Sequence, residues 1–246
     1  MLRNIRDLYG FAIHATDGDI GSAHDFYFDD QQWTVRHLVV TTGRWLSHHR
    51  VLVPPMSVTN VDRNSREFHT ALTKAQVANS PDVDTDKPVS RQRHAEVYWH
   101  YGFTGSVLPE EPRREEGDPH LRRTREVIGY FVYGVDDRIG HVDDFLVDDG
   151  SWIIRYMVVD TRSWWLGRKV LVPPGWIVSI KWEGMAVSVD LFRAAVRRAP
   201  DYDPGLPIDR DYETRLYESY GRPKYWRDGA PGHGGAPVGN NSRRMH

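Results

Sequence analysis

Matched carboxylates recur in two parts of the sequence that lie 119 positions apart (144 minus 25): Asp25 and Asp29 have counterparts in Asp144 and Asp148. Two carboxylates roughly 5 to 10 Å apart form the acid–base pair of glycoside hydrolases. On an extended strand, however, four residues span about 13 Å, so these pairs are too far apart for that chemistry. We therefore expect Asp29 to shape a turn, together with Asp30, and to form an ion pair with Arg36.

The twelve histidines are a second place to look for chemistry. A duplicated site should show its reactive side chain in both copies, yet His14 stands opposite Tyr133, and no other histidine has a histidine counterpart. This argues against a duplicated histidine-dependent acid–base or metal site. Eight histidines lie between residues 14 and 100, which leaves a metal or pH sensor confined to the first copy as an alternative.

Other motifs of catalysis and cofactor binding are missing from the sequence. There is no cysteine, which excludes disulfides, thiolate catalysis and cysteine-based metal sites. There is no glycine-rich dinucleotide or phosphate loop and no Gly-x-Ser-x-Gly elbow. Asp82 and Asp84 lack the glycine and closing glutamate of a calcium loop. We predict a protein that is not an enzyme and has no cofactor.

The elements that position these residues are written twice. Gly21–Asp30 and Gly140–Asp149 share one pattern, and each leads through a tryptophan to a run of valines and then to Val-Leu-Val-Pro-Pro. Matching continues without a gap from about 6 to 102 and from 125 to 221, which indicates a tandem duplication. We expect one domain at 1–103, a charged, proline-containing linker at 104–123, a second domain at 124–227 and a disordered tail at 228–246.

Each copy reads as five or six short strands followed by two helical pieces. Helices are expected over 72–79 and 191–198, and again after the caps Ser90 and Asp209. The apolar phase of the second strand shifts at Asp25 and at Asp144, which predicts a β-bulge there. The predicted fold class is α+β, with two tandem small β-barrels, each followed by short helices. The strands are expected at 8–15, 21–29, 35–41 and 50–53 in the first copy, at 127–133, 140–148, 153–160 and 169–172 in the second, and in a final hairpin at 176–189.

Composition limits the class of partner. The 32 basic and 34 acidic residues nearly cancel, so no global field draws the chain to nucleic acid or to anionic lipid. No stretch approaches 18 apolar residues and no signal peptide is recognisable, so we expect a cytoplasmic protein without a transmembrane segment.

An aromatic loop is the most suggestive surface feature. Tryptophan beside arginine is typical of interaction hot spots, although the same rings could instead pack inside the protein. The candidate surface consists of Arg44, Trp45, Arg162, Trp164, Trp165 and Arg168.

The Gly-x-x-x-Asp-Phe-x-x-Asp-Asp pattern, the valine run and the Val-Leu-Val-Pro-Pro strand resemble the PRC-barrel domain. This small barrel is shared by the cytoplasmic part of the photosynthetic reaction-centre H subunit and the C-terminal half of the 16S rRNA processing factor. The resemblance, to tandem PRC-barrel proteins of bacteria, implies a non-enzymatic adaptor that docks a protein partner or self-associates. It leaves two alternatives open: an RNA- or ribosome-associated factor, and a role like that of the H subunit in photosynthetic electron transfer.

Overall fold

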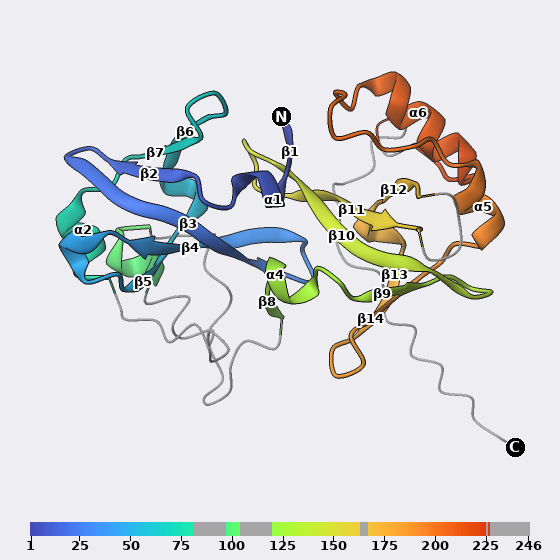
Figure 1. Cartoon of the computed structure of the whole chain (residues 1–246), viewed down its shortest axis with the longest axis horizontal. Helices are drawn as coiled ribbons and strands as arrows, with labels where there is room; N and C mark the ends of the chain where they lie inside the picture. The colour runs from blue at the N-terminus through green and yellow to red at the C-terminus, as the bar shows by residue number, and fades with distance from the viewer. Residues whose placement is uncertain (81–96, 104–119, 163–166, 225, 227–246) are drawn as a thin grey trace, which may run out of the picture.

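The computed structural model describes residues 1–80, 97–103, 120–162, 167–224 and 226. Two sheets form, one from each copy, and they have the same strand order (Figure 1). In the first half the order is β5 (Arg50–Val53), β4 (Thr34–Thr42), β3 (Gly18–Asp29), β2 (Ala12–Ala15), β7 (Glu67–Thr70) and β6 (Val58–Asp62). In the second half it is β12 (Lys169–Val172), β11 (Ile154–Asp160), β10 (Arg138–Asp148), β9 (Phe131–Tyr133), β14 (Ala186–Val189) and β13 (Ile177–Lys181). The strand-rich α+β class is therefore confirmed.

Hydrogen bonding does not close either sheet into a barrel within the described residues, which corrects our expectation of closed barrels. The outermost strands are β5 and β6 in one sheet and β12 and β13 in the other. A proline pair ends β5 and β12, and short 3₁₀ turns, η2 (Pro55–Ser57) and η3 (Pro174–Trp176), lead into β6 and β13. Because proline has no N–H to donate, these pairs interrupt the ladder at the point where each barrel would have to close.

Each half gives a short strand to the sheet of the other. β1 (Leu2–Asn4) pairs antiparallel with β10, and Leu2 lies opposite Asp148. β8 (Leu121–Arg123) pairs antiparallel with β3, and Leu121 lies opposite Asp29. One helical turn follows each strand, α1 (Ile5–Leu8) and α4 (Thr124–Val127). The sequence pattern predicts none of these four elements, and the structure corrects the linker prediction, because residues 121–123 belong to β8.

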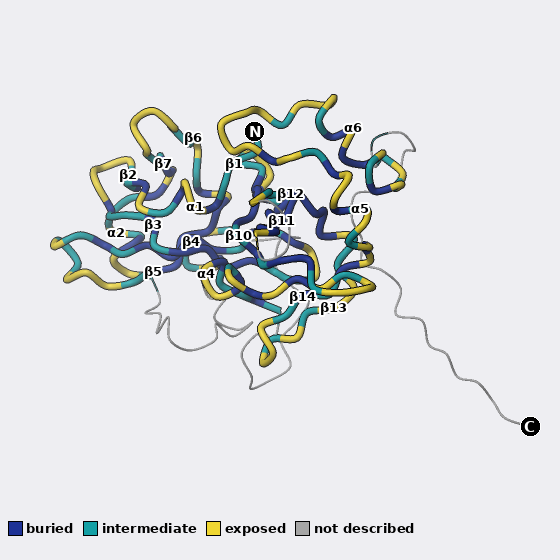
Figure 2. Tube along the Cα trace, turned by 45° about the vertical axis from the view of Figure 1, so that its right-hand side comes forward, coloured by how far each residue is buried: buried dark blue, intermediate teal, exposed yellow. Residues whose placement is uncertain are grey.

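Aromatic side chains join the two halves at the centre of the molecule. The amide of Val35 donates to the carbonyl of Trp152 at 2.8 Å, and the amide of Ile154 donates to that of Trp33 at 2.7 Å. The rings of Phe28 and Phe145 lie 5.6 Å apart between the sheets. The buried apolar residues of both halves form one continuous cluster, and in Figure 2 the buried segments run through the middle of both sheets. The two halves therefore share a core.

Local predictions for the second strand are confirmed. The pairing of β3 with β4 shifts register between Ala23 and Asp25, and that of β10 with β11 shifts between Val142 and Asp144. These are the bulges that the change of apolar phase predicts. The bulges turn both buried aspartates toward the junction between the halves.

Helices follow the sheets as expected. α2 (Lys74–Ala78) begins with a capping box made by Thr73 and Gln76, and α5 (Arg193–Arg198) lies at the equivalent place in the second half. α6 (Arg210–Ser219) is capped by Asp209, whose carboxylate accepts from the amide of Tyr212 at 2.7 Å. The predicted cap Ser90, the calcium candidates Asp82 and Asp84, residues 104–119 and the tail from 228 lie outside the described residues. Among the helices that are described, none is long and apolar enough to cross a membrane.

Candidate interaction surface

Two aromatic side chains project from β9 on the outer side of the second sheet. Phe131 is 44% exposed and Tyr133 39%, whereas Val132 between them is fully buried. This alternation follows from the pleat, which sends successive side chains to opposite faces. The first half has Ala12 and His14 at the equivalent positions. At these two strand positions, exposed aromatic rings are therefore found in the second half and not in the first.

The strand register identifies the neighbours of these rings. Residues that pair across a ladder share a face, and the pairs extend over β10, β9, β14 and β13. The guanidinium of Arg138 lies over the ring of Phe131, 5.2 Å from its centroid. Small side chains at Ala186 and Ser188 flank the aromatic pair and leave the rings standing above the sheet. We call this surface the aromatic face; it consists of His141, Phe131, Ala186 and Lys181 in one row and Arg138, Tyr133, Ser188 and Ser179 in the next.

Of the three tryptophans in the predicted loop surface, the structure describes Trp45 alone. Trp45 lies in η1 (Arg44–Leu46) and is half-buried: its indole N–H donates to the carbonyl of Ile20 at 2.7 Å, and the ammonium of Lys74 lies over the ring at 4.7 Å. Trp45 is thus held by contacts within the first half, as the alternative of internal packing expects. Trp164 and Trp165 lie outside the described residues.

The arginines of that loop surface are placed differently from one another. Arg44 is exposed. Arg162 pairs with Asp160 at 2.6 Å, and Arg168 pairs with Asp201 and also donates to the Ala199 carbonyl at 2.7 Å. Arg168 therefore fastens the segment before α6 to the start of β12.

The turn carboxylates do what the sequence predicts. Asp29 accepts from the amides of Gln31 and Gln32 at 2.9 Å, and Arg36 reaches its other oxygen at 3.3 Å. Asp148 makes the equivalent turn by accepting from the amide of Gly150 at 2.9 Å.

The buried aspartates Asp25 and Asp144 hold the first turns of α4 and α1, each from the opposite half. Asp25 accepts from the hydroxyl of Thr124 at 2.9 Å and from the amide of Arg125 at 3.3 Å. Asp144 accepts from the amide of Arg6 at 3.2 Å, but Ile5 stands where Thr124 would. Burial raises the pKa of Asp144 to about 7, and the backbone hydrogen bonds only partly oppose this effect.

The histidines of the first half do not gather into one site within the described residues. His14 and His69 stack with ring centroids 5.3 Å apart, beside Asp19 and Glu67. His37 is fully buried and its ring packs edge-on against Tyr98, while His48 and His49 are exposed. The stacked pair is the part of the predicted histidine-rich sensor that the structure brings together.

A carboxylate–histidine cluster that the sequence did not predict lies in the second half. Ligand atoms of His141, Asp143 and Asp160 all lie within 4.8 Å of one another. However, Lys169 pairs with Asp143 at 2.7 Å, and Arg162 pairs with Asp160. Cations of the chain already neutralise both carboxylates, so the cluster is better described as an ion-pair network than as a metal site.

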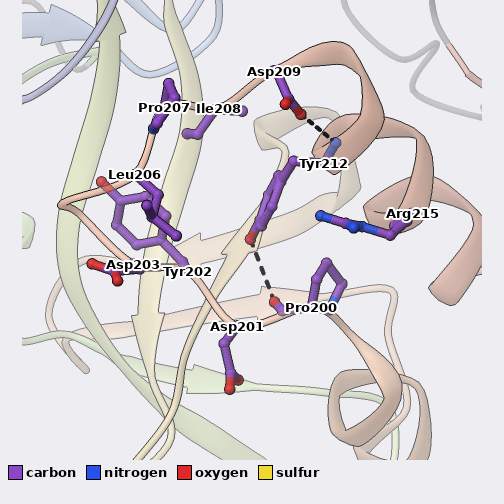
Figure 3. Close-up of a pocket in the computed structure, with 10 residues that line it drawn as sticks. All are labelled: Pro200, Asp201, Tyr202, Asp203, Leu206, Pro207, Ile208, Asp209, Tyr212 and Arg215. Atoms are coloured by element: carbon purple, nitrogen blue, oxygen red, sulfur yellow. Dashed lines mark hydrogen bonds between the residues drawn. The ribbon is translucent and has the colours of Figure 1, made fainter.

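A shallow pocket of about 390 Å³ lies beside α6 (Figure 3). Tyr202 and Tyr212 form its aromatic walls, and the hydroxyl of Tyr212 donates to the carbonyl of Pro200 at 3.4 Å. The hydroxyl of Tyr202 donates to Asn4 of the first half at 3.0 Å, so this wall also joins the two halves. Burial raises the pKa of Tyr202 to about 12, which keeps its hydroxyl protonated as a donor.

Comparison of the two copies is the sequence signal that could have found the aromatic face. Phe131 and Tyr133 look like ordinary strand residues when read alone. Only their mismatch with Ala12 and His14, at outward positions of an otherwise matched strand, marks them as surface residues with a separate role.

Two comparisons with known proteins give a match. A 50-residue stretch is 44% identical to an uncharacterized protein of Deinococcus radiodurans; it covers 20% of this chain and 18% of that protein, so the match spans less than a fifth of the relative. The family model described as "PRC-barrel domain" matches residues 119–190. This match begins just before β8, so it includes the strand given to the other half. Residues 119–190 are therefore identified as a match to the PRC-barrel domain, as the resemblance predicts for the second copy.

Proposed function

We propose that this protein is a non-enzymatic docking module that binds a protein partner through the aromatic face. The observation that carries the proposal is the exposure of Phe131 and Tyr133 on a sheet whose counterpart has alanine and histidine there. Exposed aromatic rings beside arginine are common at the centres of protein interfaces, where they bury a large area at low entropic cost.

The family match supports the same conclusion. The PRC-barrel domain is a non-catalytic fold that often serves as a protein-interaction module, and it covers the half that carries the aromatic face. We further propose that residues 1–103 and 124–227 are two units of this kind. The common strand order of the two sheets supports this division. The first unit then serves chiefly as the structural partner of the second.

The predicted loop surface around Trp45, Trp164 and Trp165 stays a prediction, with weaker support than the aromatic face. Trp45 already uses its N–H and its ring inside the first half. Its removal would cost packing in the free protein, so a binding defect there would be hard to separate from a folding defect.

The test replaces the two rings by the residues that the first half has at the same places. In Phe131→Ala/Tyr133→His, both substitutions are ones that an equivalent strand already accepts. The variant and the wild type are used to capture partners from the cell of origin, and a captured protein is then titrated against both by calorimetry. We expect the variant to bind at least tenfold more weakly, which corresponds to about 1.4 kcal/mol.

The matched control is Trp99→Ser, which removes an aromatic ring that is 61% exposed but lies outside the aromatic face. It should bind like the wild type. Equal binding by the wild type and the double variant would overturn the proposal.

A further inference from the structure

The aromatic face has a counterpart in the first half with the opposite charge. The equivalent strands β3, β2, β7 and β6 pair in the same way, so the same eight positions share the outer side of that sheet. We call this surface the acidic face; it consists of Ser22, Ala12, Glu67 and Asp62 in one row and Asp19, His14, His69 and Asn60 in the next.

Charge separates the two faces position by position. The aromatic face carries two cations, Arg138 and Lys181, and no carboxylate at its eight positions. At the same two positions the acidic face has Asp19 and Asp62, and Glu67 adds a third carboxylate. A duplication that preserves the core has thus produced one cationic and one anionic version of a single surface.

Both faces are accessible in the free molecule. The Asp19 side chain is 83% exposed, and Lys181 is exposed at the edge of its sheet. Asp62 is half-buried at the end of β6, where its carboxylate accepts from the amides of Asn64 and Ser65 in the turn that follows. Neither Arg138 nor Lys181 forms a side-chain ion pair within the described part of the chain. Their charges are therefore available to a partner.

We propose that the aromatic face of one molecule docks on the acidic face of a second copy of this chain. This inference rests on the proposed function, because it names the partner of the same surface. Opposite charges at equivalent positions would bring Arg138 and Lys181 toward Asp19 and Asp62 of the other copy, while the rings of Phe131 and Tyr133 would meet the stacked imidazoles of His14 and His69. Complementary charge of this kind sets orientation and association rate.

The contact joins unlike surfaces, so it is heterologous. A dimer of this kind still has one unoccupied aromatic face, on one molecule, and one unoccupied acidic face, on the other. Association therefore continues as a chain unless the rotation closes it into a ring. Eight positions on each side make a small interface. We therefore expect weak association, with a dissociation constant of about 10–100 µM.

The first experiment is sedimentation velocity of the wild type over a wide range of concentrations at two salt concentrations. We expect the mean mass to rise with protein concentration in about 20 mM salt and to fall toward that of the monomer in about 500 mM salt, because salt screens exposed charges. A wild type that stays monomeric at millimolar concentration in low salt would overturn the inference.

Charge exchange between the halves gives the decisive test. Asp19→Arg/Asp62→Lys puts the cations of the second half on the first, and Arg138→Asp/Lys181→Asp does the reverse. Each variant alone should stay monomeric, because its two faces carry like charges. An equimolar mixture should associate again, since each variant offers the face that complements the other.

Folding is checked by thermal unfolding of both variants, and the restored association of the mixture itself shows that the surfaces are intact. A mixture that remains monomeric, or single variants that associate as the wild type does, would contradict the inference. So would tight binding of a single-stranded oligonucleotide by a wild type that remains monomeric, since aromatic rings on a sheet also stack with bases.

The outcome can be told apart from that of the proposed function. If the wild type is monomeric but Phe131→Ala/Tyr133→His still loses a captured protein, the aromatic face docks another partner and only the present inference fails. If the double variant loses neither self-association nor a captured partner, both fail.

Discussion

The Asp144 carboxylate accepts a hydrogen bond from the backbone amide of Arg6, 138 residues earlier, at 3.2 Å. Its counterpart Asp25 makes the same bond to Arg125 at 3.3 Å, and in addition receives the hydroxyl of Thr124. Ile5 replaces that hydroxyl on the Asp144 side. Each half therefore holds the other through a buried aspartate that accepts a backbone hydrogen bond. Asp25 has one more hydrogen-bond donor from the opposite half than Asp144 has.

Asp144→Asn should change how stability depends on pH. Burial raises the folded-state pKa of Asp144 to about 7, above the ordinary value of 3.8. The protonated form is favoured in the fold, so its stabilising contribution is complete below about pH 4 and is lost as the pH rises through 7. Asparagine keeps the acceptor oxygen without the charge. In urea unfolding between pH 4 and 7, the free energy of unfolding of the variant should rise relative to that of the wild type by at most about 1.4 kcal/mol per pH unit.

Asp7→Asn serves as the control for Asp144→Asn, because Asp7 is an exposed carboxylate on α1. It removes one negative charge from the surface and should change the free energy of unfolding by less than about 0.5 kcal/mol. A difference between Asp144→Asn and the wild type that does not change with pH would mean that Asp144 is ionised at little cost in the folded protein.

Thr124→Val should destabilise the junction between the halves. The hydroxyl donates to Asp25 at 2.9 Å and lies 2.8 Å from that of Tyr9, and the residue is fully buried. Removing a donor from a buried carboxylate costs about 1–3 kcal/mol of unfolding free energy. Thr59→Val, which removes an exposed hydroxyl, should stay within about 0.5 kcal/mol of the wild type. Equal effects of the two substitutions would contradict the role given to Thr124.

Gly21→Ala and Gly140→Ala should both be severe, because each glycine lies directly against a neighbouring strand. A Cβ atom would lie 2.1 Å from the Thr41 carbonyl oxygen in the first case and 2.0 Å from that of Asp160 in the second. Backbone must move to admit it, which costs about 1–3 kcal/mol or more.

Gly184→Ala is the control for both glycines, since its nearest neighbour would be the side chain of Lys181 at 3.7 Å. The melting temperatures of the Gly21 and Gly140 variants should lie several degrees below that of Gly184→Ala. An unchanged melting temperature for either would show that its strand pairing is looser than described.

Cutting the chain within residues 104–119 should not separate the halves. β1 would still pair with β10, β8 with β3, and the core would remain shared. A protease site placed in this segment should give two fragments that elute together from a gel-filtration column in native buffer and separate in urea. Leu121→Asp, which puts a charge into the buried position of β8, should loosen the cut complex. Separation of the unmodified fragments in native buffer would disprove the shared core.

Much of the fold follows from local sequence. The bulges at Asp25 and Asp144, the Asp29 and Asp148 turns and the Asp209 cap were all predicted, because each depends on a few neighbouring residues. The exchanged strands were not. Leu2–Asn4 and Leu121–Arg123 have three residues each, too few for a periodic signal. Their partners lie far away in the sequence: Leu2 pairs with Asp148, 146 positions later (148 minus 2), and Leu121 pairs with Asp29, 92 positions earlier (121 minus 29).

The candidate surface was predicted less well than the fold. Tryptophan beside arginine drew attention to the loop, but Trp45 finds its partners within the first half. The residues on the aromatic face have ordinary strand propensity, so no single window distinguishes them. Their meaning depends on which side of a sheet they occupy, which only the tertiary structure gives, and on what the other copy has in the same place, which appears only when the two copies are compared.

The exchange of β1 and β8 between the halves has a consequence for how each half could fold alone. A half expressed alone would lack the short strand that the other half adds to its sheet. That edge could be paired only by a second molecule, so pairing would depend on protein concentration. Because the halves are fused, β1 and β8 are present at an effective concentration of about millimolar, independent of the concentration of the protein in the cell. It also places one surface of each sign in the described part of the same chain.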